Sequence, residues 1–300
     1  MSREQFNKIV NIFFTFLLAI GLTFSILACA PEATTNDRVG VVVTILPQAE
    51  FVENVGGEKI WVTVMVPPGA SPHTYEPKPA QMTALAKAEM YARVCSGVEF
   101  EIVWMDKLLA TNPDMLVVDC SRGIELQEMV AEDEHEHSER GDPHIWMSPA
   151  NARIMVRNIC AGLIGVDPEN KGYYEQNRDA YLQQLAEIDR EITDSLAGVE
   201  NRRFMVYHPA FGYFTREYDL TMISIEKEGK EPTAAGLTHL IEQAKAHDIR
   251  VIFAEPQFDP KSAEVIAEAI GGRVVLIDAL AKDYIGNLRL IMNEMLPALE

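Results

Sequence analysis

Short apolar segments rich in valine and isoleucine alternate with helix-like segments along two stretches of the chain, and this alternation constrains the fold most strongly. Continuous apolar runs are typical of strands covered on both faces, and a strand–helix–strand order produces a parallel sheet. The predicted strands are 39–46, 60–66, 90–95 and 115–119, then 203–207, 220–225, 251–254 and 274–277. The predicted helices among them are 48–55, 79–88, 99–109, 233–247, 260–269 and 283–296. The sequence therefore predicts an α/β fold with two similar lobes, each built on a parallel sheet.

A long helical segment joins the two sets of strands. Asp167 can cap its first turn, Pro168 suits that turn, and Gly198 can end it. One apolar face is indicated by residues spaced three and four apart, namely Tyr181, Leu185, Ile188, Ile192 and Leu196. At about 1.5 Å per residue the segment would form a rod of roughly 45 Å, long enough to bridge two lobes. The predicted domains are an N-terminal lobe over 39–166, a linking spine helix over 167–198 and a C-terminal lobe over 199–300.

The first 28 residues are typical of an export signal, because basic residues precede an apolar run that ends at Ala28. The run is also about long enough to span a bilayer, so an uncleaved anchor is the alternative. The sequence Ile26-Leu27-Ala28-Cys29 resembles the lipobox of prokaryotic lipoproteins, in which the cysteine receives a lipid. We therefore expect a signal peptide over 1–28, lipidation of Cys29 and a polar tether over 29–38. The folded part would then lie on the outer face of the cytoplasmic membrane or in the periplasm.

Charge and cysteine content exclude two classes of protein. The formal net charge is −19 at pH 7. Such a charge repels phosphate backbones and argues against general nucleic-acid binding. Four cysteines in 300 residues are too few for a disulfide scaffold. Cys95 and Cys120 each lie near the end of a predicted strand. If those strands are neighbours, the pair could form a disulfide in an oxidising compartment; buried free thiols are the alternative.

Three histidines lie in proline-containing loops, and one aspartate ends a predicted strand. They are His73, His144, His208 and Asp278. Ligand groups gather at the carboxyl ends of parallel strands, and each half of the chain supplies two of these residues, so a cleft between lobes could bring them together. Three imidazoles and one carboxylate complete a tetrahedral shell for a divalent transition metal, and imidazole favours zinc over calcium or magnesium. The alternatives are surface histidines in turns and an aspartate that caps a helix.

Several of these stretches resemble the metal-binding solute-binding proteins of zinc and manganese ABC importers, and the zinc-uptake lipoproteins in particular. The resemblance covers about 39–298 and depends on 67–77, 142–149, 208–214, 253–257 and 276–278. It implies two α/β lobes bridged by one long helix, with a metal site in the cleft between them. It also implies metal ligands at His73, His144, His208 and Asp278. The chain departs from the family at Ala279, where members often have proline, and this affects the expected local backbone rather than the ligand.

The resemblance also bears on which metal binds. Zinc-type relatives have histidine at the position of His208, where manganese-type relatives often have glutamate, so we expect Zn²⁺, with Mn²⁺ as the alternative. A ligating histidine usually donates its second ring N–H to an acceptor, and Glu255 at the end of a predicted strand could be that acceptor. His135 and His137 lie in the acidic stretch 132–139, which resembles a histidine-rich loop of zinc-type relatives and could gather metal weakly.

The predicted function is metal capture for an importer rather than catalysis. Four protein ligands would leave no open position for a catalytic water, and the chain has no His-Glu-x-x-His, Gly-x-Ser-x-Gly or glycine-rich phosphate motif. We expect a monomer that docks on an ABC-transporter permease and is held at the membrane by its lipid. The alternatives are a secreted zinc hydrolase, with Asp278 outside the shell and Glu255 as base, and a surface adhesin on the same scaffold.

Overall fold

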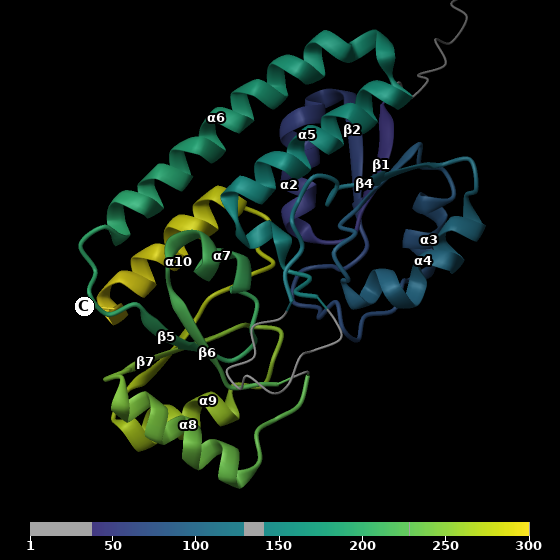
Figure 1. Ribbon diagram of the computed structural model, residues 1–300. Coiled ribbons are helices and arrows are strands. Elements are labelled where there is room, and N and C mark those ends of the chain that lie inside the picture. The colour runs from purple at the N-terminus through teal and green to yellow at the C-terminus, as the bar shows by residue number, and fades with distance from the viewer. Residues whose placement is uncertain (1–37, 129–140, 228, 300) are drawn as a thin grey trace, which may run out of the picture. The chain divides into compact units, whose positions relative to one another are not determined.

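Two four-stranded parallel sheets with the same strand order form the framework of the protein. The computed structural model describes residues 38–128, 141–227 and 229–299 (Figure 1). The N-terminal sheet has the order β2-β1-β3-β4, with β1 Val39–Val43, β2 Ile60–Val64, β3 Met90–Arg93 and β4 Leu116–Asp119. The C-terminal sheet has the order β6-β5-β7-β8, with β5 Arg203–Val206, β6 Thr221–Ser224, β7 Val251–Ala254 and β8 Arg273–Leu276. The predicted fold class is confirmed. Each predicted strand is present: β1 to β6 are shorter than predicted, β7 has the predicted bounds and β8 is shifted by one residue.

Helices connect successive strands in both halves, as a parallel sheet requires. In the first half they are α2 Leu46–Gly56, α3 Pro79–Leu85 and α4 Glu99–Thr111. In the second half they are α7 Gly212–Tyr218, α8 Ala234–Ala246 and α9 Lys261–Ile270, followed by α10 Tyr284–Leu299. Because every strand runs in the same direction within its sheet, the loops that follow the strands meet at one edge of each sheet.

The linking segment differs in detail from the predicted single helix. Helix α5 (Pro149–Val166) packs against α6 (Lys171–Leu196), and a 3₁₀ turn at Pro168–Asn170 separates them (Figure 1). Asp167 does not cap α6. Its Oδ2 accepts hydrogen bonds from the Tyr174 hydroxyl at 2.6 Å and the Asn170 amide at 2.8 Å, and so fixes the turn instead. The predicted apolar face is buried as expected, at Tyr181, Leu185, Ile188, Ile192 and Leu196.

The hydrophobic core continues from one sheet to the other. One cluster joins the N-terminal sheet, α5, α6 and α10 to Phe204 and Phe253 on the C-terminal sheet, while a second cluster lies around Ile252 and Ile266. The described residues belong to one compact unit that begins at Arg38. The predicted lobe boundaries therefore remain predictions. Within the described ranges, no helix combines the length and the apolarity needed to cross a bilayer. The predicted signal peptide and Cys29 lie outside the described residues.

Candidate metal centre

The loops at the carboxyl ends of the strands surround a cavity of about 560 Å³. His208 follows β5 and Glu255 follows β7, two neighbouring strands between which the chain order of the sheet reverses. Such a reversal leaves a crevice at the carboxyl edge, the usual place for a ligand in an open α/β sheet. His73 reaches the same cavity from the loop after β2, and His144 reaches it from the residue before a 3₁₀ turn at Ile145–Met147.

The three predicted histidines come together in this cavity. The Nε2 atoms of His144 and His208 face each other at 3.2 Å. The ring of His73 lies 5.2 Å from the ring of His208, centroid to centroid, and His208 also stacks on Phe258 at 4.7 Å. His144 and His208 are buried, whereas the side chain of His73 is 36% exposed. The three histidines, of which His73 and His208 are more than 130 positions apart in the sequence, therefore form one cluster of imidazoles.

A buried carboxylate faces the Nδ1 atom of each buried histidine. Asp142 Oδ1 lies 2.8 Å from Nδ1 of His144 and also accepts the backbone N–H of His144 at 2.9 Å. Glu226, just after β6, lies 3.3 Å from Nδ1 of His208 and accepts the backbone N–H of Gly229 at 2.8 Å. A carboxylate on Nδ1 fixes the ring and leaves Nε2 as an acceptor, which is the arrangement of metal-binding histidines.

The acceptor for the His208 ring is Glu226 rather than Glu255, and sequence reasoning missed both Glu226 and Asp142. Glu255 Oε2 accepts the backbone N–H of His208 at 3.2 Å, so it supports the same residue by a different route. A signal for Glu226 was present, because it follows a strand just as Asp278 does. For Asp142, the signal was its place two residues before His144 in an Asp-Pro-His sequence.

The electrostatics of the cavity favour neutral histidines. Burial lowers the pKa of His208, and burial together with the neighbouring His208 lowers the pKa of His73. Burial alone would raise the pKa of Glu226, but hydrogen bonds from His208 and Gly229 lower it below its ordinary value. Neutral rings beside an ionised carboxylate are ready to accept a cation without first losing protons.

Glu255 has the opposite character. Burial raises its pKa well above the ordinary value, and the carboxylates of Glu226 and Asp278 add to the shift. Its Oε1 atom is buried and has no hydrogen-bond partner among the residues that the structure describes. Burial therefore favours the neutral form of the Glu255 carboxyl group, which accepts one hydrogen bond from the backbone of His208.

Asp278 lies beside the cavity rather than on its lining. Its neighbours Ala279 and Leu280 line the space, while Asp278 Oδ1 accepts hydrogen bonds from the Gln257 amide at 2.8 Å and the Leu280 N–H at 2.9 Å. Over the described parts of the chain, no group of three or more His, Cys, Asp or Glu side chains is already arranged to hold a metal ion. The structure thus assembles the imidazoles and leaves the fourth predicted ligand engaged elsewhere. His135 and His137 lie outside the described residues.

Two hydrogen bonds join the His144 loop to the Asp278 loop. The indole Nε1–H of buried Trp146 donates to the carbonyl oxygen of Ala279 at 2.8 Å, and the Tyr284 hydroxyl donates to the carbonyl oxygen of Trp146 at 2.7 Å. Each loop carries one predicted ligand, at His144 and at Asp278. The two halves of the candidate site are therefore connected directly and not only through the helices behind it.

Comparisons with known proteins identify the family of this chain. Residues 41–297 match the family described as "Zinc-uptake complex component A periplasmic", ZnuA. The "High-affinity zinc uptake system protein ZnuA" of Bacillus subtilis is 31% identical over 88% of this chain and 88% of its own length. A "Putative metal-binding protein" of Treponema pallidum is 32% identical over 88% of this chain and 87% of its own length.

Solved structures show the same fold. A "Crystal structure of ZnuA" is 40% identical, with a TM-score of 0.83 over 88% of this chain and 100% of that one. The metal-dependent lipoprotein YcdH of Bacillus subtilis is 28% identical, with a TM-score of 0.72 over 87% of this chain and 99% of that one. The two solved chains are covered over almost their whole length, so the similarity extends to both sheets and the helices between them.

Proposed function

Because this chain belongs to the family of the periplasmic zinc-uptake component ZnuA, we propose that it captures a divalent transition metal, zinc foremost, and delivers it to an ABC importer. The cargo would bind at His73, His144 and His208, with Asp278 as the fourth ligand. The permease of the importer would be the partner that receives the metal. Lipidation at Cys29 would hold the protein, as a monomer, on the outer face of the cytoplasmic membrane.

The observation that supports this proposal most strongly is the pair of opposed Nε2 atoms. Two nitrogen ligands about 2.05 Å from a tetrahedral zinc ion lie about 3.3 Å apart. The Nε2 atoms of His144 and His208 are 3.2 Å apart, and each ring has a carboxylate on its other nitrogen. The spacing is that of two ligands of one ion, and two neutral acceptors that face each other gain nothing without a cation or a proton between them.

Completion of the shell requires a small rearrangement. The Gln257 amide occupies Asp278 Oδ1, so this amide must release the carboxylate before it can bind metal. The ring of exposed His73 must also turn toward the two buried histidines, and Glu99 Oε2 lies 3.5 Å from its Nδ1 atom to orient it. Metal binding would therefore require movements of the Asp278 and His73 side chains, while His144 and His208 already face each other.

The donor set favours zinc over manganese and capture over catalysis. Three imidazoles and one carboxylate form a nitrogen-rich shell, and affinities at such sites are higher for Zn²⁺ than for Mn²⁺. With all four positions filled, no water is activated at the metal. The Glu255 carboxyl group accepts a hydrogen bond from the backbone N–H of His208 and has a raised pKa, which suits a supporting residue better than a general base.

Isothermal calorimetry with metal analysis on the full chain tests the proposal. We expect one zinc per chain, and His208→Ala should weaken binding by at least a hundredfold because it removes a ligand from the centre of the cluster. His239→Ala, at an exposed position on α8, is the matched control and should bind as the wild type does. Competition with Mn²⁺ should leave zinc bound. Failure of the wild type to take up zinc tightly would overturn the proposal.

A further inference from the structure

Two free cysteines lie at the carboxyl ends of neighbouring strands in the N-terminal sheet. Cys95 follows β3 and is partly exposed, and Cys120 follows β4 and is fully buried. The third free cysteine of the described chain, Cys160, is on α5, where its sulfur is near the Arg178 guanidinium. The predicted function uses none of these thiols.

The strand register places Cys95 and Cys120 within reach of each other. Arg93 pairs with Asp119, and the Cys120 N–H donates to the Arg93 carbonyl oxygen at 2.9 Å. Neighbouring strands are about 4.8 Å apart with a rise of about 3.3 Å per residue, so diagonal neighbours in regular strands have Cα atoms about 6 Å apart. Continued beyond the strand ends, this register makes Cys95 and Cys120 diagonal neighbours. Disulfides join Cα atoms that are about 4.4–6.8 Å apart.

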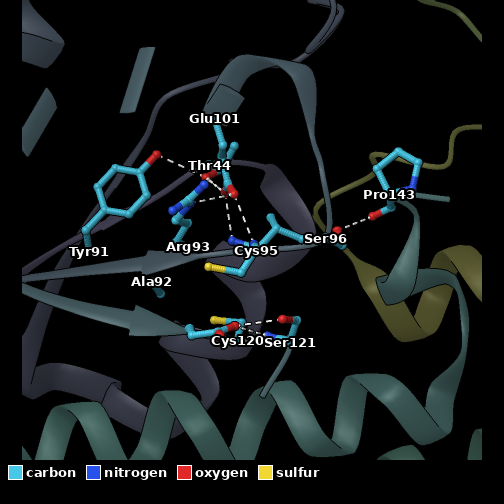
Figure 2. Close-up of polar contacts among 12 residues, drawn as sticks. Thr44, Tyr91, Ala92, Arg93, Cys95, Ser96, Glu101, Cys120, Ser121 and Pro143 are labelled. Carbon is cyan, nitrogen blue, oxygen red and sulfur yellow. Dashed lines mark hydrogen bonds and ion pairs between the residues drawn. The ribbon is translucent and has the colours of Figure 1, made fainter. Parts of the chain in front are cut away.

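The backbone of Cys95 departs from the regular alternation of side chains between the two faces of the sheet. Diagonal neighbours in regular strands point to opposite faces of the sheet. Cys95 instead has a φ of 60°, a left-handed conformation that interrupts the alternation, and its N–H donates to the buried carboxylate of Glu101 at 3.0 Å. The side chain of Asp119, the residue directly before Cys120, lies close enough to the Cys95 thiol to raise its pKa. Figure 2 shows Cys95 and Cys120 at the ends of the two neighbouring strands.

The surroundings of the two thiols disfavour thiolates. Burial, assisted by the carboxylate of Glu101, raises the pKa of Cys95 to about 12 and raises that of Cys120 well above its ordinary value. Thiolates are the species that attack and that leave in thiol–disulfide exchange. A disulfide between these two sulfurs would therefore form slowly in the folded protein, and it would resist reduction once formed.

We propose that Cys95 and Cys120 form an intramolecular disulfide when the chain meets a disulfide oxidant. The two thiols lose two protons and two electrons, and one S–S bond forms between them. The S–S bond of the oxidant breaks, and the oxidant leaves as two thiols. This bond would join the ends of β3 and β4 at the edge of the sheet that faces the cavity.

The disulfide would also stiffen the segment that supports two histidines. Directly after Cys95, the Ser96 hydroxyl donates to the carbonyl oxygen of Pro143, which precedes His144 (Figure 2). Glu99, four residues after Cys95, lies 3.5 Å from Nδ1 of His73. We therefore expect the oxidised protein to release zinc about two- to fivefold more slowly than the reduced protein, a consequence that rests on the proposed function.

Peptide mapping of the metal-free full chain tests the disulfide itself. The protein is incubated with glutathione disulfide, denatured, alkylated with N-ethylmaleimide and digested without reductant for mass spectrometry. We expect one cross-linked peptide pair that contains Cys95 and Cys120, while Cys160 is alkylated. Closure of this loop should raise the midpoint of thermal unfolding by about 5 °C, and a reductant should reverse the rise.

Matched variants separate this bond from other oxidation. Cys95→Ser and Cys120→Ser should lose both the cross-link and the difference in thermal midpoint between oxidised and reduced samples, and Cys160→Ser should keep both. Full alkylation of Cys95 and Cys120 after oxidation, or glutathione adducts without a cross-link, would overturn the proposal. Because mapping needs no metal, a failure of zinc binding would leave this result standing, and the zinc release rate is compared only if the wild type binds zinc.

Discussion

The two halves of the candidate site hold their buried histidines in different ways. On the N-terminal side, Asp142 is two residues from His144 and binds both its ring and its backbone N–H, at 2.8 and 2.9 Å. On the C-terminal side, Glu226 is 18 residues from His208 and lies 3.3 Å from its ring, and it is shared with the N–H of Gly229. One histidine is oriented by its own loop, and the other depends on the pairing of β5 with β6.

The C-terminal side contains a second contrast, between two buried carboxyl groups that both contact His208. Glu226 has a lowered pKa because the ring of His208 and a backbone N–H face its carboxylate, whereas burial raises the pKa of Glu255. The distance from His208 is similar, so the number and charge of the facing donors decide which group is ionised. Of these two groups, Glu226 is the one whose pKa shift favours the ionised form.

Among substitutions that leave all three imidazoles in place, the largest effect should come from removal of the two ring-orienting carboxylates. Loss of such a group typically lowers metal affinity by about 10–100-fold. We expect Asp142→Asn to approach the upper limit, because its contact is short and fixes both ring and backbone, and Glu226→Gln to lie near the lower limit. Calorimetry with zinc measures both, and Asp259→Asn, an exposed carboxylate that binds Lys261, is the control. A larger loss in Glu226→Gln would reverse the comparison.

A second prediction separates the two halves from each other. Trp146→Phe removes the indole donor to Ala279 and leaves the carbonyl oxygen of Ala279 without this partner, in a buried position. An unsatisfied buried acceptor costs about 1–3 kcal/mol, so the free energy of unfolding should fall by about that amount. Zinc release, followed with a chelator, should become several-fold faster because the His144 and Asp278 loops are no longer joined by this bond.

The control for this prediction is Trp61→Phe on β2, where the side chain is 49% exposed. A substitution there should change the free energy of unfolding by less than about 0.5 kcal/mol. Equal zinc release rates in Trp146→Phe and wild type would show that the two half-sites are held together by the helices alone.

Much of the fold was predictable because it depends on local patterns. Continuous apolar runs identified the eight strands, and the spacing from Tyr181 to Leu196 identified the buried face of α6. The break at Pro168 was missed, because a proline that suits a first turn also suits a 3₁₀ turn, and only the contact between Tyr174 and Asp167 decides between them. Helix α5 was not predicted, although its first turn is capped by Ser148.

In the candidate site, too, local sequence patterns were predictable and long-range contacts were not. The three histidines could be selected because each lies in a loop beside proline, and the structure brings them together. The role of Glu226 depends on a strand pairing that no local pattern encodes. The engagement of Asp278 by Gln257 is a contact across 21 residues, so sequence alone indicated the ligand type and not its present partner.

A third prediction concerns acid. The folded-state pKa values of His73 and His208 are lowered, so below pH 6.5 the unfolded chain binds more protons than the folded chain does. The metal-free protein should therefore lose stability as the pH falls through about 6.5 and toward the lowered values. Urea unfolding at several pH values measures this loss, and His208→Asn should show a weaker dependence. Saturating zinc should steepen it, because acid must then also displace the metal.

The smallest effect on zinc binding should come from Glu255→Gln. Burial favours the neutral form of the Glu255 carboxyl group, and an amide of the same shape can still accept the backbone N–H of His208. We expect zinc affinity to stay within about threefold of wild type, far from the loss in Glu226→Gln. A tenfold loss would mean that Glu255 is ionised beside the bound metal, and the contrast between the two carboxyl groups would then disappear.

The pH dependence of stability provides a second test of Glu255→Gln. A raised folded-state pKa contributes stability that is fully present below the ordinary value of 4.5 and is lost as the pH rises. Wild type should therefore lose stability relative to Glu255→Gln from about pH 4.5 upward, in the direction opposite to the effect of the histidines. Urea midpoints of the two metal-free proteins, compared from pH 5 to 8, isolate this contribution. A constant difference over that range would show that Glu255 does not titrate differently in the folded and unfolded states.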